Sequence, residues 1–233
     1  TYAQQQFAHA WSVLGQFAAQ QQGEKSLHQS LVPHAPYSVS EGLFRMIAAA
    51  AGRSSLMSIH NQESAEENSF YKDKSGAVVD LLEGLGIDHA FFKPAGASSI
   101  QTYLPWFEKG PPFIFVHNTF TTAEDVRFAH NCRSPIYWCF CPNANLYIEN
   151  TLPDILKLVI QEQMHICIGT DSLASNDRLC ILSELVTLKE HFPELTWETL
   201  FRWGTANGAA ALQMPDLGRI RPGVRPGIIQ VTD

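Results

Sequence analysis

The sequence feature that most constrains the fold is a series of short, continuous apolar runs that each end at or near a polar residue. Three of these runs are residues 56–59 before His60, residues 113–116 before His117, and residues 166–168 shortly before Asp171. Longer segments with apolar residues at helical spacing lie between the runs. Continuous apolar strands that alternate with helices are typical of a parallel sheet covered on both faces. The pattern therefore predicts an α/β fold.

Five strands are predicted in all, ending near His34, His60, His117, Cys141 and Asp171. Polar side chains at the carboxyl ends of parallel strands face the mouth of an α/β barrel, where active sites of that fold lie. A closed barrel of this kind has eight strands, so we expect the chain to be the later portion of a longer protein. The sequence also predicts a strand at 30–34, a polar loop at 61–75, one helix at 196–213 and a strand at 228–231.

Composition excludes several classes of partner. The chain has 233 residues and a formal net charge of -7, and it contains no basic run, which argues against nucleic acid and anionic membranes as partners. It has no apolar stretch of membrane-spanning length. Its cysteines, 5 in number, lie mostly in apolar surroundings and predict reduced thiols, as expected in the cytoplasm.

The polar residues at the strand ends belong to short motifs whose order is informative. The motifs are Pro33-His34-Ala35-Pro36, His60-Asn61-Gln62-Glu63, His117-Asn118-Thr119, Cys141-Pro142-Asn143-Ala144-Asn145 and Gly169-Thr170-Asp171-Ser172. Together they resemble the amidohydrolase superfamily, and more closely its cytosine-deaminase-like, chlorohydrolase-type branch of metal-dependent hydrolases.

The resemblance implies a (β/α)8 TIM-type barrel of which this chain carries strands four to eight. Residues 1–217 would form the partial barrel, and residues 218–233 would return towards a small β-sandwich. The family's first strand carries a His-x-His pair that supplies two further metal ligands, and this chain contains no His-x-His. A non-catalytic remnant is therefore one alternative to an enzyme.

The resemblance also implies a role for each strand-end residue. His60, His117 and Asp171 correspond to metal ligands, and Asp171 doubles as the general base. Glu63 corresponds to the acid that shuttles a proton to a ring nitrogen. His34 and Asn143 correspond to residues that contact the substrate.

The implied activity is hydrolytic deamination of an aminated heterocycle by metal-activated water. The expected cofactor is one divalent metal ion, with zinc favoured over iron. The substrate class is an adenine-type nucleoside, cytosine or guanine, and S-adenosylhomocysteine or aminodeoxyfutalosine is preferred. The alternatives within the superfamily are hydrolytic dechlorination and hydrolysis of an amide or ring C–N bond. A homodimer is the expected assembly.

Overall fold

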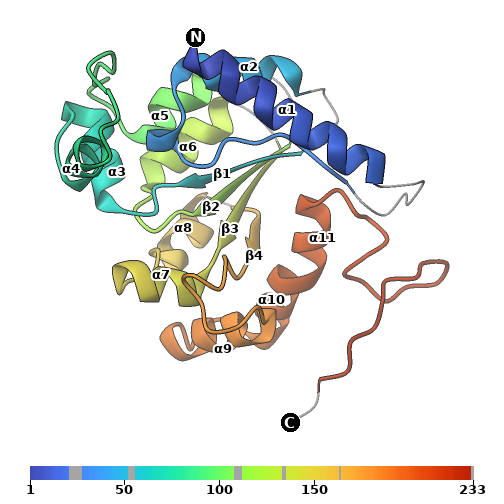
Figure 1. Ribbon diagram of the computed structural model, residues 1–233. Helices are drawn as coiled ribbons and strands as arrows, with labels where there is room; N and C mark the ends of the chain where they lie inside the picture. Colours follow the sequence, from blue (N-terminus) through green and yellow to red (C-terminus); the bar gives the residue numbers. More distant parts are fainter. Residues whose placement is uncertain (21–27, 52–55, 108–111, 133–134, 163, 232–233) are drawn as a thin grey trace.

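The centre of the molecule is a parallel sheet of 4 strands in the order β1-β2-β3-β4 (Figure 1). The computed structural model describes residues 1–20, 28–51, 56–107, 112–132, 135–162 and 164–231. The strands are β1 (Met57–Asn61), β2 (Phe113–His117), β3 (Ile136–Phe140) and β4 (Ile166–Ile168). Because each strand lies beside its predecessor in sequence, the connecting helices return over the same face of the sheet. The predicted α/β class is confirmed.

The main apolar core lies between one face of this sheet and the helices that cover it. The helices on this face include α2 (Glu41–Ala50), α5 (Ser99–Tyr103), α6 (Ala123–Cys132) and α8 (Ile155–Glu162). Side chains alternate along a strand, so every second strand residue enters the core. Phe113, Phe115 and Trp138 are fully buried there. Burial of each such side chain contributes about 1.5–3 kcal/mol, which holds the strand ends in place.

The opposite face of the sheet carries a smaller apolar cluster. Ile114, Cys167 and Ala211 are buried in it, and Val116 and Cys139 are partly buried beside them. The register pairs His60 with Val116 across β1 and β2, so His60 faces the same side as this cluster. In an α/β barrel this face is the interior.

The remaining helices surround the sheet and its carboxyl edge. They are α1 (Tyr2–Gln20), α3 (Ala65–Asp73), α4 (Ala77–Gly84), α7 (Pro142–Glu149), α9 (Ile181–His191), α10 (Trp197–Arg202) and α11 (Gly208–Ala211), with the 3-10 turns η1 (Pro36–Ser38) and η2 (Leu104–Trp106) and the π-helical turn η3 (Trp203–Asn207). Helix α1 lies against α2 and has no buried residue (Figure 1). Within the described ranges, no helix combines the length and apolarity needed to cross a membrane.

The strand predicted at residues 30–34 is not formed. That segment is irregular, although His60 N donates to His34 O at 3.0 Å and ties it to the outer edge of β1. Pro33 has no N–H group and interrupts any ladder of hydrogen bonds with β1. The segment still brings His34 beside the end of β1.

One other prediction about the connections was wrong, and a further one is confirmed with a local irregularity. The expected polar loop at 61–75 contains helix α3, whose polar sequence hid its buried residues Phe70 and Tyr71. The expected single helix at 196–213 is interrupted by the π-helical turn η3. In that turn Asn207 Nδ2 donates to Ile166 O at 2.7 Å, so a side chain caps the start of β4.

The strand predicted at 228–231 is also absent, and this part of the chain runs away from the sheet (Figure 1). Ile228 and Ile229 are 83% and 91% exposed, and no described segment offers them a partner strand. A strand needs such a partner to satisfy its backbone N–H and C=O groups. The division into residues 1–217 and 218–233 stays a prediction, and residues 232 and 233 lie outside the described ranges.

Candidate metal centre

Three of the strand-end residues meet at the carboxyl edge of the sheet. His60 lies in β1, His117 ends β2, and Asp171 follows β4. One ligand atom from each of them lies within 4.8 Å of the others. Neutral imidazole and carboxylate are donor types that suit divalent zinc or iron. The fold therefore gathers a His/His/Asp group from positions far apart in sequence.

His117 is held in one orientation by a single neighbour. Its Nδ1 lies 2.8 Å from Asn145 Oδ1, and Asn145 Nδ2 lies 3.5 Å from the His117 carbonyl oxygen. The amide oxygen is thus the group that faces Nδ1, which makes Nδ1 the protonated nitrogen. Nε2 then carries a lone pair, and it is buried without a hydrogen-bond partner. A metal ion would satisfy this nitrogen.

The backbone of His117 explains how its ring reaches the site. Strict alternation along β2 would place the side chain on the helix-covered face, together with Phe115. The residue instead has a φ of 72°, in the left-handed region that non-glycine residues rarely occupy. This turn brings the ring to the His60 side, where the two ring centroids lie 5.0 Å apart.

Both imidazoles of the group have lowered pKa values, which favours their neutral forms. Burial lowers the pKa of His60, and the neighbouring His117 lowers it further. Burial also lowers the pKa of His117, whereas the hydrogen bond to Asn145 opposes this effect. A neutral imidazole is the form that binds a metal ion.

Asp171 occupies a second left-handed turn, with a φ of 55°. Its Oδ2 accepts a hydrogen bond from the Ser175 hydroxyl. Asn176 Nδ2 donates to the carbonyl oxygen of Thr170 at 2.8 Å and so fixes the residue before Asp171. Strained residues of this kind persist where surrounding contacts over-determine them, often at functional sites.

Glu63 enters the same group from the turn after β1. Its Oε1 lies 3.4 Å from His117 Nε2, and its side chain is 16% exposed. Burial raises the pKa of the Glu63 carboxyl, and His60 opposes this effect while Asp171 adds to it. A partly exposed carboxyl group with a raised pKa, beside the candidate ligands, is suited to giving and taking a proton.

The two residues expected to contact a substrate lie in different settings. The ring of His34 packs edge-on to His60 at 4.9 Å, and its Nδ1 lies 3.0 Å from Ser38 Oγ. Asn143 instead turns its amide towards α9, where Nδ2 lies 3.0 Å from Glu184 Oε1 and Oδ1 accepts from Thr187 at 2.6 Å. The predicted substrate contact of His34 fits its place, whereas the amide of Asn143 is already engaged.

Sequence reasoning missed the buried polar side chains beneath the site. Glu67 and Glu184 have no exposed surface and bind the turns that carry Glu63 and Asp171, respectively. A usable signal for Glu67 was its spacing, because it lies four positions after Glu63. Asn145 had a signal too, since it follows the apolar β3 within the quoted Cys141 motif.

The cysteines have free thiols in all 5 cases. Cys139 and Cys141 surround Gly169, where an added Cβ would lie 2.9 Å and 3.2 Å from their sulfur atoms. Glycine at this position thus allows β4 to approach β3 closely just before Asp171.

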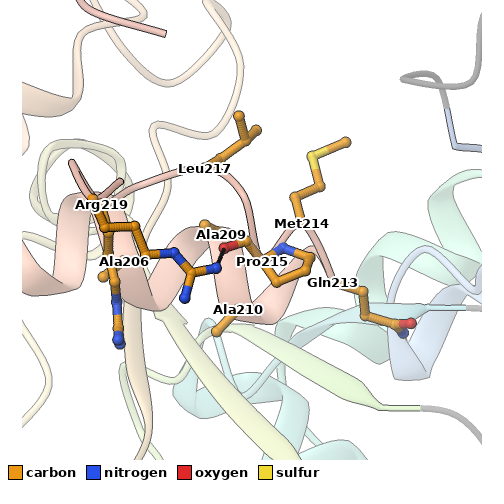
Figure 2. Close-up of a pocket in the computed structure, with 9 residues that line it drawn as sticks. Ala206, Ala209, Ala210, Gln213, Met214, Pro215, Leu217 and Arg219 are labelled. Carbon is orange, nitrogen blue, oxygen red and sulfur yellow. Dashed lines mark hydrogen bonds between the residues drawn. The ribbon is translucent and has the colours of Figure 1, made fainter. Parts of the chain in front are cut away.

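A separate hollow lies along α11 and the segment that follows it (Figure 2). It has a volume of about 450 Å³, and its lining includes Ala209, Met214 and Arg219. None of the predicted site residues lines it. It forms a different feature from the group at the carboxyl edge of the sheet.

Known proteins resemble the chain over nearly its full length. The sequence model described as the amidohydrolase family matches residues 17–232. A 5'-deoxyadenosine deaminase of Methanothermobacter thermautotrophicus is 27% identical over 209 residues, covering 86% of this chain and 43% of that protein. A 5-methylthioadenosine/S-adenosylhomocysteine deaminase of Pyrococcus abyssi is 29% identical over 192 residues, covering 78% of this chain and 39% of that protein.

A solved structure shows the same fold. The aminofutalosine deaminase of Helicobacter pylori superposes with a TM-score of 0.71 at 24% identity, covering 92% of this chain and 55% of that one. This match confirms the predicted barrel type of α/β fold, of which the chain forms a part. The chain spans about half the length of the curated relatives it matches.

Proposed function

Because the chain belongs to the amidohydrolase family, we propose that the protein hydrolytically deaminates an adenine-type nucleoside. The observation that carries this proposal is the convergence of His60, His117 and Asp171, with Glu63 beside them. Relatives named as deaminases of adenosine derivatives support the substrate class. S-adenosylhomocysteine and aminodeoxyfutalosine are the preferred candidates.

The proposed cofactor is one divalent metal ion held by His60, His117 and Asp171, and zinc is favoured over iron. The fit is supported by the unpartnered Nε2 of His117 and by the burial that keeps both imidazoles neutral. A bound divalent ion supplies Lewis-acid chemistry that makes water nucleophilic at neutral pH.

The side chains of this chain would manage the protons and the substrate. Asp171 accepts a proton from the attacking water, and Glu63 delivers a proton to a ring nitrogen of the heterocycle. The proton held by Asp171 then passes to the amino group, ammonia leaves, and Glu63 regains a proton from the hydroxyl group that has been added to the ring. His34, which packs on His60, contacts the substrate. General acid–base help of this kind supplies about 10²–10⁴-fold in rate.

The first test is a panel of purine and pyrimidine amines assayed for ammonia release. We expect the complete gene product that carries this chain to release ammonia from adenine-type nucleosides. If it acts on none of the amines, hydrolytic dechlorination or hydrolysis of an amide or ring C–N bond becomes the better hypothesis, since metal and fold do not fix the leaving group.

The second test is Glu63→Gln, which keeps the size of the side chain but removes its titratable proton. Turnover should fall by about 10²-fold or more. Metal content should stay near the wild-type value, because His60 and Asp171 are untouched. The contrasting variant His60→Ala should lose metal and activity together. An E63Q protein that keeps its turnover would remove proton shuttling by Glu63 from the proposal.

Three further expectations belong to the proposal. The free thiols suit a reducing compartment such as the cytoplasm. A homodimer is expected, and light scattering on the complete gene product would measure its molar mass in solution. A non-catalytic protein is kept as the alternative, because these 233 residues contain no His-x-His pair. A gene product that binds no zinc and hydrolyses none of these substrates would support that alternative.

A further inference from the structure

The turn that joins His60 to Glu63 has an unfavourable backbone. Gln62 has a φ of 47°, which L-residues other than asparagine and aspartate seldom adopt. Such a conformation costs on the order of 1–3 kcal/mol and persists only when its surroundings hold it. The direction in which Glu63 leaves the chain depends on this turn, because Gln62 directly precedes it.

Glu67, which lies in the first helical turn of α3, stabilises the backbone turn at Gln62. Its Oε1 accepts a hydrogen bond from Gln62 N at 2.8 Å, and it also accepts one from the Ser99 hydroxyl. A hydrogen bond from the backbone of Glu63 also lowers the pKa of this carboxyl group. Glu67 is completely buried, so water does not compete for these donors.

The side chain of Gln62 is fixed separately from its backbone. Its Oε1 accepts from the Thr121 hydroxyl at 2.6 Å, and its Nε2 donates to Asp125 Oδ2 at 3.1 Å. These bonds anchor the amide group of the side chain to the α6 side of the sheet, and Nε2 also donates to Asn68 Oδ1 of α3 at 3.2 Å. The hold of Glu67 on the peptide N–H is therefore a distinct contact, directed at the turn itself.

We propose that Glu67 is a positioning residue for the reaction, because it fixes the turn that presents the Glu63 carboxyl group to His117 and to the substrate. The inference rests on the proposed role of Glu63 as the proton shuttle. Glu67 itself touches neither the substrate nor the candidate metal ligands in any hydrogen bond of the described residues. Its effect is on the geometry of proton transfer and hence on kcat.

The geometry also indicates which replacement should preserve the role. The required group is an acceptor oxygen at the end of a side chain of this length, because Gln62 N and the Ser99 hydroxyl both donate to Oε1. Glutamine places its amide oxygen at the same reach. Alanine removes the acceptor and leaves the Gln62 N–H buried without a partner.

The kinetic experiment compares Glu67→Ala and Glu67→Gln with a matched control, Glu66→Ala. Glu66 is the neighbouring carboxylate and also accepts a backbone N–H, from Ala77 at 2.8 Å, but this contact leads to α4. We expect E67A to lower kcat by about 10–100-fold with KM changed less than about twofold, as misplacement of a reacting group does. E67Q and E66A should stay within about threefold of wild type.

Amide hydrogen exchange tests the same contact without reference to catalysis. In E67A, exchange at the Gln62 amide should accelerate by about tenfold or more, while E66A and E67Q should leave it protected. If the wild-type protein deaminates nothing, the proposed function fails, and this exchange measurement alone decides on Glu67. Unchanged protection in E67A, or an equal fall in kcat for E66A, would overturn the inference.

Discussion

Glu67 and Glu184 are glutamates without exposed surface, but they lie beneath different sides of the candidate site. Glu67 supports the turn after β1, and its second oxygen, Oε2, has no hydrogen-bond partner. Glu184 supports the loops after β3 and β4, and both of its oxygens accept N–H groups. These donors are Asn143 N at 2.8 Å, Asn143 Nδ2 at 3.0 Å and Asn176 Nδ2 at 2.7 Å.

The difference shows how hydrogen-bond donors decide the charge state of a buried acid. Burial raises the pKa of both carboxyl groups, and in Glu184 the N–H groups of Asn143 and Asn176 oppose that rise. In Glu67 the hydrogen bonds to the side chain reach only Oε1, burial outweighs them, and the pKa is raised to about 8. Because three N–H groups donate to its two oxygens, we expect Glu184 to accept them as a carboxylate, whereas the raised pKa of Glu67 favours its neutral form.

The largest expected effect comes from Glu184→Gln. The new amide would face either Asn143 N or the two asparagine side chains, and each of these is a donor. The free energy of unfolding at pH 7 should fall by about 3 kcal/mol, as when a buried polar group loses its partner. Chemical denaturation would measure this loss. The exposed neighbour Glu190 provides the control, because E190Q should change stability by less than about 0.5 kcal/mol. A stable E184Q protein would show that Glu184 is neutral, and the contrast with Glu67 would disappear.

Across any single pH unit, an intermediate effect should appear in the pH dependence of stability. The folded-state pKa of Glu67, about 8, lies above its ordinary value of 4.5, so folding favours the protonated form. The stabilisation is complete below the ordinary value and is lost as pH rises towards 8. Its loss should lower the free energy of unfolding by roughly 1 kcal/mol per pH unit over this window.

Glu67→Gln should remove that component of the slope, because glutamine does not titrate. Glu66→Gln should keep the slope, since Glu66 makes neither of the two buried contacts of Glu67, with Gln62 N and with the Ser99 hydroxyl. Urea titrations at several pH values between the two pKa values would compare the three proteins. Identical slopes for wild type and E67Q would show that Glu67 is ionised in the folded protein.

The smallest effect is expected for Asn143→Ala. Its amide bonds to Glu184 and Thr187, so the free energy of unfolding should fall by about 1 kcal/mol. KM should remain unchanged if the amide serves only α9. Thr187→Val, which removes the partner hydroxyl, should reproduce the loss of stability. A clear rise in KM for N143A alone would restore the predicted substrate contact of Asn143.

The sequence predicted where the site lies better than it predicted how the His117 ring reaches it. Apolar runs before His60, His117 and Asp171 were sufficient to locate three strand ends, because parallel strands bring their carboxyl ends to one edge. The left-handed backbone of His117 was not predictable, since the enrichment of histidine at positive φ is too weak to single out one residue. Its ring reaches the site only through that turn.

The connections were predicted less well for a related reason. Helix α3 has few apolar residues, and its buried Glu67 is held by hydrogen bonds that periodicity does not detect. The segment at 30–34 has an apolar pattern, but Pro33 and the lack of an outer partner keep it from forming a strand. The substrate contact that the resemblance implies for Asn143 stays a prediction, while the contacts of its amide lie on α9, about forty residues further along the chain.

The left-handed residues Gln62, His117 and Asp171 have a consequence for attempts to improve this protein. Glycine at His117 or Asp171 would relax the backbone but would remove a candidate ligand, so a screen that rewards heat resistance alone would favour variants without the site. At these two turns, a gain in stability and the loss of the proposed chemistry would therefore come from the same substitution.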